Sequence, residues 1–275
     1  MEIDYANRFA ALAHPQRLSV LRLLLRRYPD EVPAGEVAEA LDMKANTLSP
    51  YLGTLMAAGM ITQRRVGTSL RYGAKPSGLG ELLDGFLKEC CQGRPDLCLS
   101  LDNLRTLKKE PDMPYRVLFV CTGNSARSIF AETVLRQLGG DRFEVHSAGT
   151  NPASQLNPLA VSMLENKGHD IAGLRAKHVS EFQGPDVEPL DFVFTVCDRA
   201  ANEACPPWLG QPVTGHWSTP DPVKAQGTEA ERMLAFQKAY GMLRNRIEAF
   251  IALPIETLDR ISLKNAVDDI ARGTA

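Results

Sequence analysis

Residues 117–128 read Val-Leu-Phe-Val-Cys-Thr-Gly-Asn-Ser-Ala-Arg-Ser, and this stretch decides the fold class of the second half of the chain. Four apolar residues typical of a buried strand lead into Cys121, a small polar loop follows, and an amphipathic pattern after Arg127 predicts a helix. A strand, a tight loop and a helix N-terminus together turn backbone N–H groups inward and form a site for an anion. Strands and helical patterns alternate through this half, which predicts a parallel α/β sheet.

Cys121 and Arg127 carry the chemistry that this loop predicts. The Arg127 guanidinium can clamp a tetrahedral oxyanion in a fork that a lysine cannot reproduce. We expect the same field to lower the pKa of Cys121 and to make its thiolate a nucleophile. The alternative is a buried structural cysteine beside a surface arginine. The residues expected to surround the oxyanion are Thr122, Gly123, Asn124, Ser125, Ala126 and Arg127.

The composition is that of an ordinary soluble globular protein of 275 residues, with 44% hydrophobic and 23% charged residues. A formal net charge of −2 neither indicates nor excludes nucleic acid as a partner. No stretch is apolar enough for a membrane span and the acidic start is unlike a signal peptide, so we expect a cytoplasmic protein without a membrane partner. The six cysteines form two triplets, which suggests metal or thiol chemistry rather than structural disulfides.

Composition and pattern divide the chain into two halves. Residues 1–99 are almost wholly helical with one hairpin, and residues 100–114 carry charge and then two prolines, as expected of a linker. Residues 115–254 make up the predicted α/β domain. Residues 255–275 predict a final packing helix without chemistry of its own.

The first half has the order of a winged helix-turn-helix domain of the α+β class. A short helix is expected over residues 34–41, and the next helix from an Asn46 N-cap, with Pro50 in its first turn and Gly59 as its stop. Two short strands follow, at residues 60–65 and 70–73.

The second helix of this pair is the predicted DNA-reading element. Leu48, Leu52 and Leu55 would face the core. The polar residues left outward, which suit a DNA groove, are Asn46, Thr47, Ser49, Tyr51 and Thr54. The hairpin arginines that could meet phosphates are Arg64, Arg65 and Arg71. The alternative is that these arginines are only a solvated face.

Three motifs make residues 5–98 resemble the arsenic- and metal-responsive winged-helix repressors: Leu-Ala-His-Pro-Gln-Arg-Leu (12–18), Asn-Thr-Leu-Ser-Pro-Tyr-Leu (46–52) and Ala-Gly-Met-Ile (58–61). The resemblance implies a homodimer that binds operator DNA and leaves it when a thiophilic ion binds. Many such proteins carry cysteines on the helix before the recognition helix. This chain has Val-Ala-Glu-Ala (37–40) there, so that version of the ion site is absent.

The first cysteine triplet predicts a different ion site. Cys90 and Cys91 are adjacent and point about 100° apart on a helix, so they cannot close a site alone. Gly93 and Pro95 end the helix and could bring Cys98 back to the pair. Three thiolates without a histidine favour a thiophilic ion, and trivalent arsenic fits better than tetrahedral zinc; antimonite would bind similarly. Some arsenite-responsive repressors are similar here. The alternative is three incidental cysteines.

The second half resembles the low-molecular-weight tyrosine phosphatases and the related thiol-dependent arsenate reductases. Beside the Cys-x5-Arg loop, the matching motifs are Ser-Ala-Gly-Thr (147–150), Asp-Phe-Val-Phe-Thr-Val-Cys-Asp (191–198) and Asp-Pro (221–222). The resemblance implies a parallel sheet with flavodoxin-like strand order. It leaves two activities open, because both use the same loop.

Two features favour the reductase. Cys197 ends an apolar strand and Cys205 follows eight residues on, as a resolving pair would be placed. Val223 stands after Asp-Pro where aryl phosphatases usually have an aromatic residue, although Trp217 could partly substitute. Ala126 stands where relatives often have a second loop cysteine, and the long Cys197-to-Cys205 step leaves thioredoxin and glutathione with glutaredoxin both open as reductant.

The expected reaction uses Cys121, Arg127, Ser128, Asp221, Cys197 and Cys205. Arsenate sits in the loop, Ser128 hydrogen-bonds the Cys121 thiolate, and Asp221 acts as general acid. Cys197 and Cys205 then pass a disulfide to an external thiol, and no tightly bound cofactor is expected. The whole chain would thus be a repressor fused to the enzyme that makes its effector. The alternatives are a regulator fused to a tyrosine phosphatase and a non-enzymatic oxyanion sensor.

Overall fold

The computed structural model describes residues 2–90, 113–184, 186–203, 208 and 210–273. The chain forms two compact units, Met1–Asn103 and Leu104–Ala275. Each has its own hydrophobic core. Within the described residues, none of the helices combines the length and the apolar character needed to cross a membrane.

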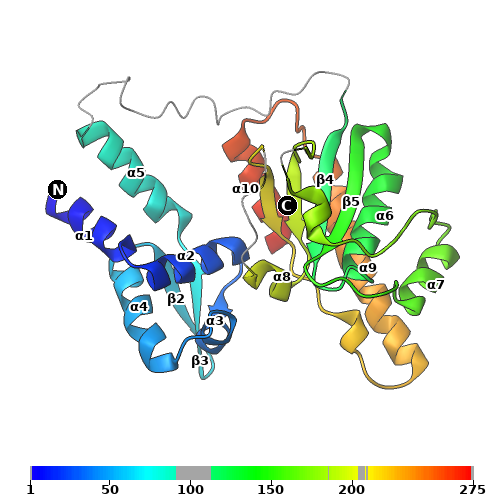
Figure 1. Ribbon diagram of the computed structural model, residues 1–275, viewed down its shortest axis with the longest axis horizontal. Helices are drawn as coiled ribbons and strands as arrows, with labels where there is room; N and C mark the ends of the chain where they lie inside the picture. The colour runs from blue at the N-terminus through cyan, green and yellow to red at the C-terminus, as the bar shows by residue number, and fades with distance from the viewer. Residues whose placement is uncertain (1, 91–112, 185, 204–207, 209, 274–275) are drawn as a thin grey trace. The chain divides into compact units, whose positions relative to one another are not determined.

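The first unit is a winged helix-turn-helix domain, as predicted. Its short sheet has the antiparallel order β1-β3-β2. The helices surround this sheet in Figure 1. The elements are α1 (Glu2–Leu12), α2 (Pro15–Arg27), β1 (Val32–Pro33), α3 (Ala34–Ala40), α4 (Ala45–Ala57), β2 (Ile61–Val66), β3 (Ser69–Ala74) and α5 (Pro76–Cys90).

Helix α4 begins two residues earlier than predicted. Lys44, not Asn46, is the N-cap residue, and it makes no side-chain capping bond. The preceding turn sets this start, because Asp42 has a φ of +48° and the Met43 N–H donates to the Ala38 carbonyl. Pro50 therefore lies in the second turn of α4 rather than the first. Gly59, with a φ of +69°, follows the helix as predicted.

The apolar face of α4 fixes its orientation in the first unit. Leu48, Leu52 and Leu55 are buried in the core, as predicted. The hairpin that follows pairs Val66 with Ser69 across a two-residue loop, and Gly67 takes a φ of +59° in it. Such a loop needs a left-handed residue, which glycine supplies without steric cost.

The second unit is an α/β domain whose four strands are all parallel, in the order β5-β4-β6-β7. This is the predicted flavodoxin-like order. Figure 1 shows β4 and β5 beside α6. The elements are β4 (Tyr115–Cys121), α6 (Arg127–Gly139), η2 (Gly140–Arg142), β5 (Phe143–Gly149), α7 (Pro158–Asn166), η3 (Val179–Phe182), β6 (Phe192–Thr195), α8 (Asp198–Asn202), β7 (Val213–His216), η4 (Pro222–Lys224), α9 (Glu229–Ile251) and α10 (Arg260–Arg272).

Parallel pairing places the carboxyl ends of the four strands along one edge of the sheet. Helix α6 packs on β4, β5 and α9, and β4 is buried along almost its whole length. Cys121 pairs with Gly149 in register, and Val120 pairs with Thr195. The loops after β4, β5 and β6 therefore leave the sheet side by side, where open α/β sheets bind their ligands.

Helix α10 belongs to the core of the second unit. It packs on β7, with Leu263, Val267 and Ile270 buried. A Cβ at Gly215 would lie 2.7 Å from Val267 Cγ1, so the helix approaches the strand only because residue 215 is glycine. Arg260–Arg272 thus form a packing helix, as predicted for this part of the chain.

Candidate active site

The loop between β4 and α6 surrounds the Cys121 thiol. Cys121 is 3% exposed and ends β4, and α6 begins at Arg127 with no side-chain cap on its first N–H groups. Ser128 Oγ lies 2.9 Å from Cys121 Sγ, and the Asn124 N–H donates to the same sulfur at 3.1 Å. Because the Asn124 side-chain amide donates to Ser128 Oγ at 2.9 Å, the Ser128 hydroxyl proton is directed to Cys121.

The prediction that Cys121 has a lowered pKa is wrong. Burial raises the pKa of the Cys121 thiol above its ordinary value, and the nearby Cys197 adds to this effect. Ser128, Arg127 and the Asn124 N–H lower it, in that order, without outweighing burial. The expected stabilising groups are present, but the sequence did not reveal how deeply the thiol is buried.

Asn124 is the most constrained residue of the loop. It is fully buried with a φ of +43°, a left-handed conformation that asparagine tolerates better than most residues. Its side-chain amide also donates to Ser147 Oγ at 2.8 Å, and its carbonyl oxygen accepts from the Lys177 N–H at 2.7 Å. These bonds hold the loop in its shape.

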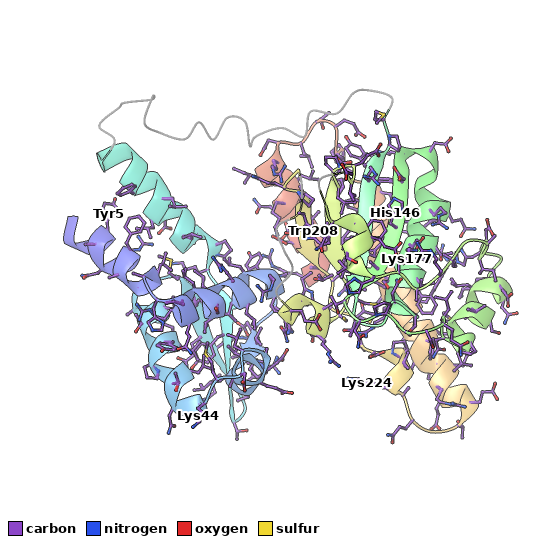
Figure 2. The ribbon with its side chains drawn as sticks, in the orientation of Figure 1. Tyr5, Lys44, His146, Lys177, Trp208 and Lys224 are labelled. Atoms are coloured by element: carbon purple, nitrogen blue, oxygen red, sulfur yellow. The ribbon has the colours of Figure 1, made fainter. Side chains whose placement is uncertain are left out.

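Behind Asn124 lies a buried pair of charged residues, Glu132 and Lys177, that was not predicted from the sequence. Glu132 accepts a hydrogen bond from Ser147, and Lys177 Nζ lies 3.3 Å from Glu132 Oε2. Figure 2 labels Lys177 among the side chains of the second unit. The signal in the sequence was a carboxylate in the middle of the apolar run that α6 buries. Buried charges are retained where they are paired and hydrogen-bonded, as here.

Arg127 and Asp221 form an ion pair at the cavity. Arg127 Nη2 lies 2.9 Å from Asp221 Oδ2, and Arg127 Nη1 donates to the Thr219 carbonyl at 3.1 Å. Asp221 also accepts from the Val223 N–H at 3.2 Å, which begins η4. The guanidinium is thus held at the loop by the same segment that supplies Asp221.

Cys197 reaches the loop from the neighbouring strand. It is buried, caps α8 by accepting from the Ala200 N–H at 3.5 Å, and has its sulfur 3.5 Å from Thr122 Oγ1. Cys121 and Cys197 are both free thiols. Cys205, the other proposed partner thiol, lies outside the described residues.

A cavity of about 610 Å³ is lined by residues from all of these segments. Its walls hold the two thiols of Cys121 and Cys197 as well as Arg127 and Asp221. The other lining residues are Thr122, Gly123, Ser125, Ala126, Asp198, Arg199, Ser218, Thr219, Pro220, Val223 and Lys224, the last labelled in Figure 2. Of the predicted loop ligands, Asn124 alone is absent from the lining, because its side chain points into the structure behind the loop.

The expectation that Trp217 could replace an aromatic platform is wrong. Trp217 is completely buried and stacks on Phe194 with ring centroids 4.1 Å apart. Val223, which is 49% exposed, stands at the cavity instead. Within the described residues, the cavity wall contains no aromatic side chain.

The first unit displays most of the residues predicted to read DNA. On α4, Asn46, Thr47, Ser49 and Thr54 are exposed, and Tyr51 is half-buried because its hydroxyl donates to Gln16 at 2.7 Å. On the hairpin, Arg65 is exposed and Arg71 is half-buried.

Arg64 forms an ion pair within the first unit. Its guanidinium lies 2.6 Å from a Glu31 carboxylate oxygen. Arg64 also stands directly across the hairpin from Arg71. Of the predicted ion ligands, Cys90 is the last residue of α5 and its side chain is outside the described part, as are Cys91 and Cys98.

The class of protein follows from this geometry: an α/β domain with a Cys-x5-Arg loop at the carboxyl edge of its sheet, joined in one chain to a helix-turn-helix unit. A model of the family "Low molecular weight phosphotyrosine protein phosphatase" matches residues 116–262, and a "Helix-turn-helix domain" model matches residues 12–64. The chain belongs to the low-molecular-weight phosphotyrosine protein phosphatase family.

Several proteins that are similar to the second half of the chain carry the name arsenate reductase. "Arsenate reductase" of Bacillus subtilis is 38% identical over 135 residues, which cover 49% of this chain and 93% of that protein. "Glutaredoxin arsenate reductase" of Synechocystis sp. is 31% identical over 137 residues, 50% of this chain and 96% of that protein. A solved "arsenate reductase in the phosphate binding state" is 29% identical, with a TM-score of 0.42, and covers 50% of this chain and 97% of that one.

Proposed function

We propose that the second unit reduces arsenate to arsenite. The observation that carries this proposal is the meeting of two free thiols, Cys121 and Cys197, with Arg127 and Asp221 in one cavity. The curated relatives named arsenate reductase support the same activity. A phosphatase needs only one of the two thiols, so the second thiol favours the reductase.

In the first step, the Cys121 thiolate attacks the arsenic of bound arsenate. Arg127 leaves Asp221 and holds the oxyanion, and the loop N–H groups receive the charge that develops on it. Asp221 protonates an arsenate oxygen, which departs as water when the S–As bond forms. Ser128 hydrogen-bonds the thiolate before the attack, and this lowers the energy of the reactive form.

In the second step, Cys197 completes the two-electron reduction. The Cys197 thiolate attacks Cys121 sulfur, the S–As bond breaks, and its electron pair stays on arsenic, which leaves as arsenite. Cys205 then attacks Cys197, which gives a Cys197–Cys205 disulfide and returns Cys121 as a thiolate. An external dithiol, thioredoxin or glutathione with glutaredoxin, reduces that disulfide. The presence of Cys121 and Cys197 in the lining of one cavity supports this order.

The test is arsenate reduction by purified protein with each donor in turn. Wild type should turn over with one donor, and Cys197→Ser and Cys205→Ser should each lose turnover. Cys197→Ser should release no detectable arsenite, although its Cys121 loop should still bind the oxyanion. Phenyl phosphate hydrolysis that survives both substitutions, without arsenate turnover, would establish the phosphatase alternative. Loss of every function but oxyanion binding would favour the sensor alternative.

We propose further that the first unit is a transcriptional repressor controlled by the product. Its helix-turn-helix match and the exposed polar face of α4 support DNA binding, and a homodimer would present two such helices. Trivalent arsenic at Cys90, Cys91 and Cys98 is the proposed release signal. Operator DNA retained by Cys90→Ser protein but released by wild type on arsenite addition would support this; release from both would contradict it.

A further inference from the structure

A second cavity of about 340 Å³ lies in the α/β unit, away from the Cys121 loop. None of its described lining residues is shared with the first cavity. Val134, at its wall, is seven residues beyond Arg127 on α6, which places it roughly 10 Å along the helix axis. Its volume falls at the lower end of the range of about 300–1,000 Å³ that is typical of ligand pockets. The lining residues are Val134, Gln137, Leu138, Lys167, His169, Tyr240 and Arg244.

The charged groups at this cavity are all cations. Lys167 and Arg244 come from the end of α7 and from α9, and the described lining includes no carboxylate. Arg244 Nε donates to Glu248 at 2.8 Å, and Glu248 is outside the lining, so the two Nη groups can still donate to a ligand. Lys167 Nζ lies 4.7 Å from the centre of the Tyr240 ring, a cation–π contact that holds the ammonium at the cavity.

His169 and Tyr240 add a directed donor. His169 is only 9% exposed, and its Nε2 lies 2.7 Å from the Tyr240 hydroxyl oxygen. Its Nδ1 is buried without a hydrogen-bond partner. Burial, Lys167 and Arg244 lower the pKa of His169, so the ring is neutral. An unpaired acceptor is easier to bury than an unpaired N–H donor, which places the proton on Nε2. Nε2 then donates to the Tyr240 oxygen, and the Tyr240 proton is left for a ligand.

We propose that this cavity binds a small organic anion, with its charged head on Lys167, Arg244 and the Tyr240 hydroxyl. Val134 is buried at the wall and Leu138 is 38% exposed, and these two side chains would contact a short apolar group on the same ligand. A carboxylate and a phosphate ester share this chemistry. An inorganic oxyanion would satisfy the cations but leave the apolar wall uncovered.

The test is calorimetric titration with benzoate of the full chain and of Arg127→Ala, which removes the arginine that could hold an anion at the Cys121 loop; the two should bind benzoate alike. Benzoate should bind with one site, and uncharged benzamide should bind at least about tenfold more weakly, since a charge-assisted hydrogen bond is worth about that factor. Lys167→Gln/Arg244→Gln should weaken benzoate by about tenfold or more. Tyr240→Phe should weaken it several-fold while the buried ring keeps its packing.

Lys238→Gln is the matched control, because Lys238 is exposed on the same helix but outside the lining. It should bind benzoate like wild type. No saturable benzoate binding, equal binding of benzamide, or binding unchanged in Lys167→Gln/Arg244→Gln would each overturn the proposal. If inorganic phosphate displaced benzoate with the same affinity, the proposed contact of an apolar group with Val134 and Leu138 would be overturned. The anionic group alone would then account for binding.

Discussion

At the scale of single residues, Cys121 shows how two opposed effects set the reactivity of a thiol. Burial disfavours the charged thiolate, whereas the hydroxyl of Ser128 and the N–H of Asn124 stabilise it. Because burial has the larger effect, the thiolate fraction at neutral pH is small, and it rises as the pH passes the raised pKa of Cys121.

This balance predicts opposite effects of two substitutions on Cys121 alkylation. Ser128→Ala removes a hydrogen bond to the thiolate, which should slow modification at pH 7 about tenfold, since such a bond is worth about 1.5 kcal/mol. Cys197→Ser removes a group that raises the pKa of Cys121, so it should speed modification. The measurement is the rate of iodoacetamide labelling of the Cys121 peptide against pH. Identical pH profiles for wild type and Ser128→Ala would refute the role of Ser128.

A second residue-scale prediction concerns Glu31, which pairs with Arg64 on the hairpin. Glu31→Gln frees Arg64 for a phosphate, so it should raise affinity for duplex DNA and steepen the salt dependence by about one counterion. Glu39→Gln removes the same charge from an exposed position of α3 and is the control. Fluorescence anisotropy at several salt concentrations measures both. An equal gain from the two variants would mean that only net charge matters.

At the scale of elements, α10 and β7 depend on the absence of a side chain at residue 215. Gly215→Ala would place a methyl group 2.7 Å from Val267 Cγ1 and 2.9 Å from the Phe194 ring, which should cost about 1–3 kcal/mol of stability by overpacking. Gly241→Ala in α9 meets nothing within 4 Å and should stabilise by about 0.5–1 kcal/mol through helix propensity. Urea unfolding gives both values, and a shift of the same sign would contradict the packing argument.

The elements also show what the sequence could predict. The strand, loop and helix around Cys121 were predictable, because apolar runs and glycines are local signals, whereas the strand order was predicted from the resemblance to the low-molecular-weight phosphatases. The start of α4 was not, because the turn at Asp42 and Met43, rather than the capping preference of Asn46, fixes it. The Glu132–Lys177 pair and the burial of Trp217 depend on contacts between distant segments, which spacing does not reveal.

At the scale of the whole molecule, the proposed enzyme and the proposed repressor occupy different compact units. The product of one is the proposed effector of the other. A chain of this design would respond to arsenate by first converting it to arsenite, the ion proposed to bind the thiols of the first unit.

Separate units predict separable functions. Cys121→Ser should abolish arsenate reduction and leave DNA binding and its release by added arsenite unchanged. Added arsenate should release wild type from DNA only in the presence of the thiol donor, and should not release Cys121→Ser. Gel-shift assays with arsenate or arsenite check this. Release of Cys121→Ser by arsenate would show that the oxyanion itself is sensed.

Because Arg127 is paired with Asp221, the Asp221 carboxylate competes with any oxyanion for the Arg127 guanidinium. Any arriving oxyanion must displace a carboxylate before it can use the arginine, so weakly held anions are screened out by exchange. In the proposed reaction the same exchange releases Asp221 from its cation at the moment when a proton donor is needed. Binding of the substrate and release of the proposed general acid are thus coupled by one exchange of partners at Arg127.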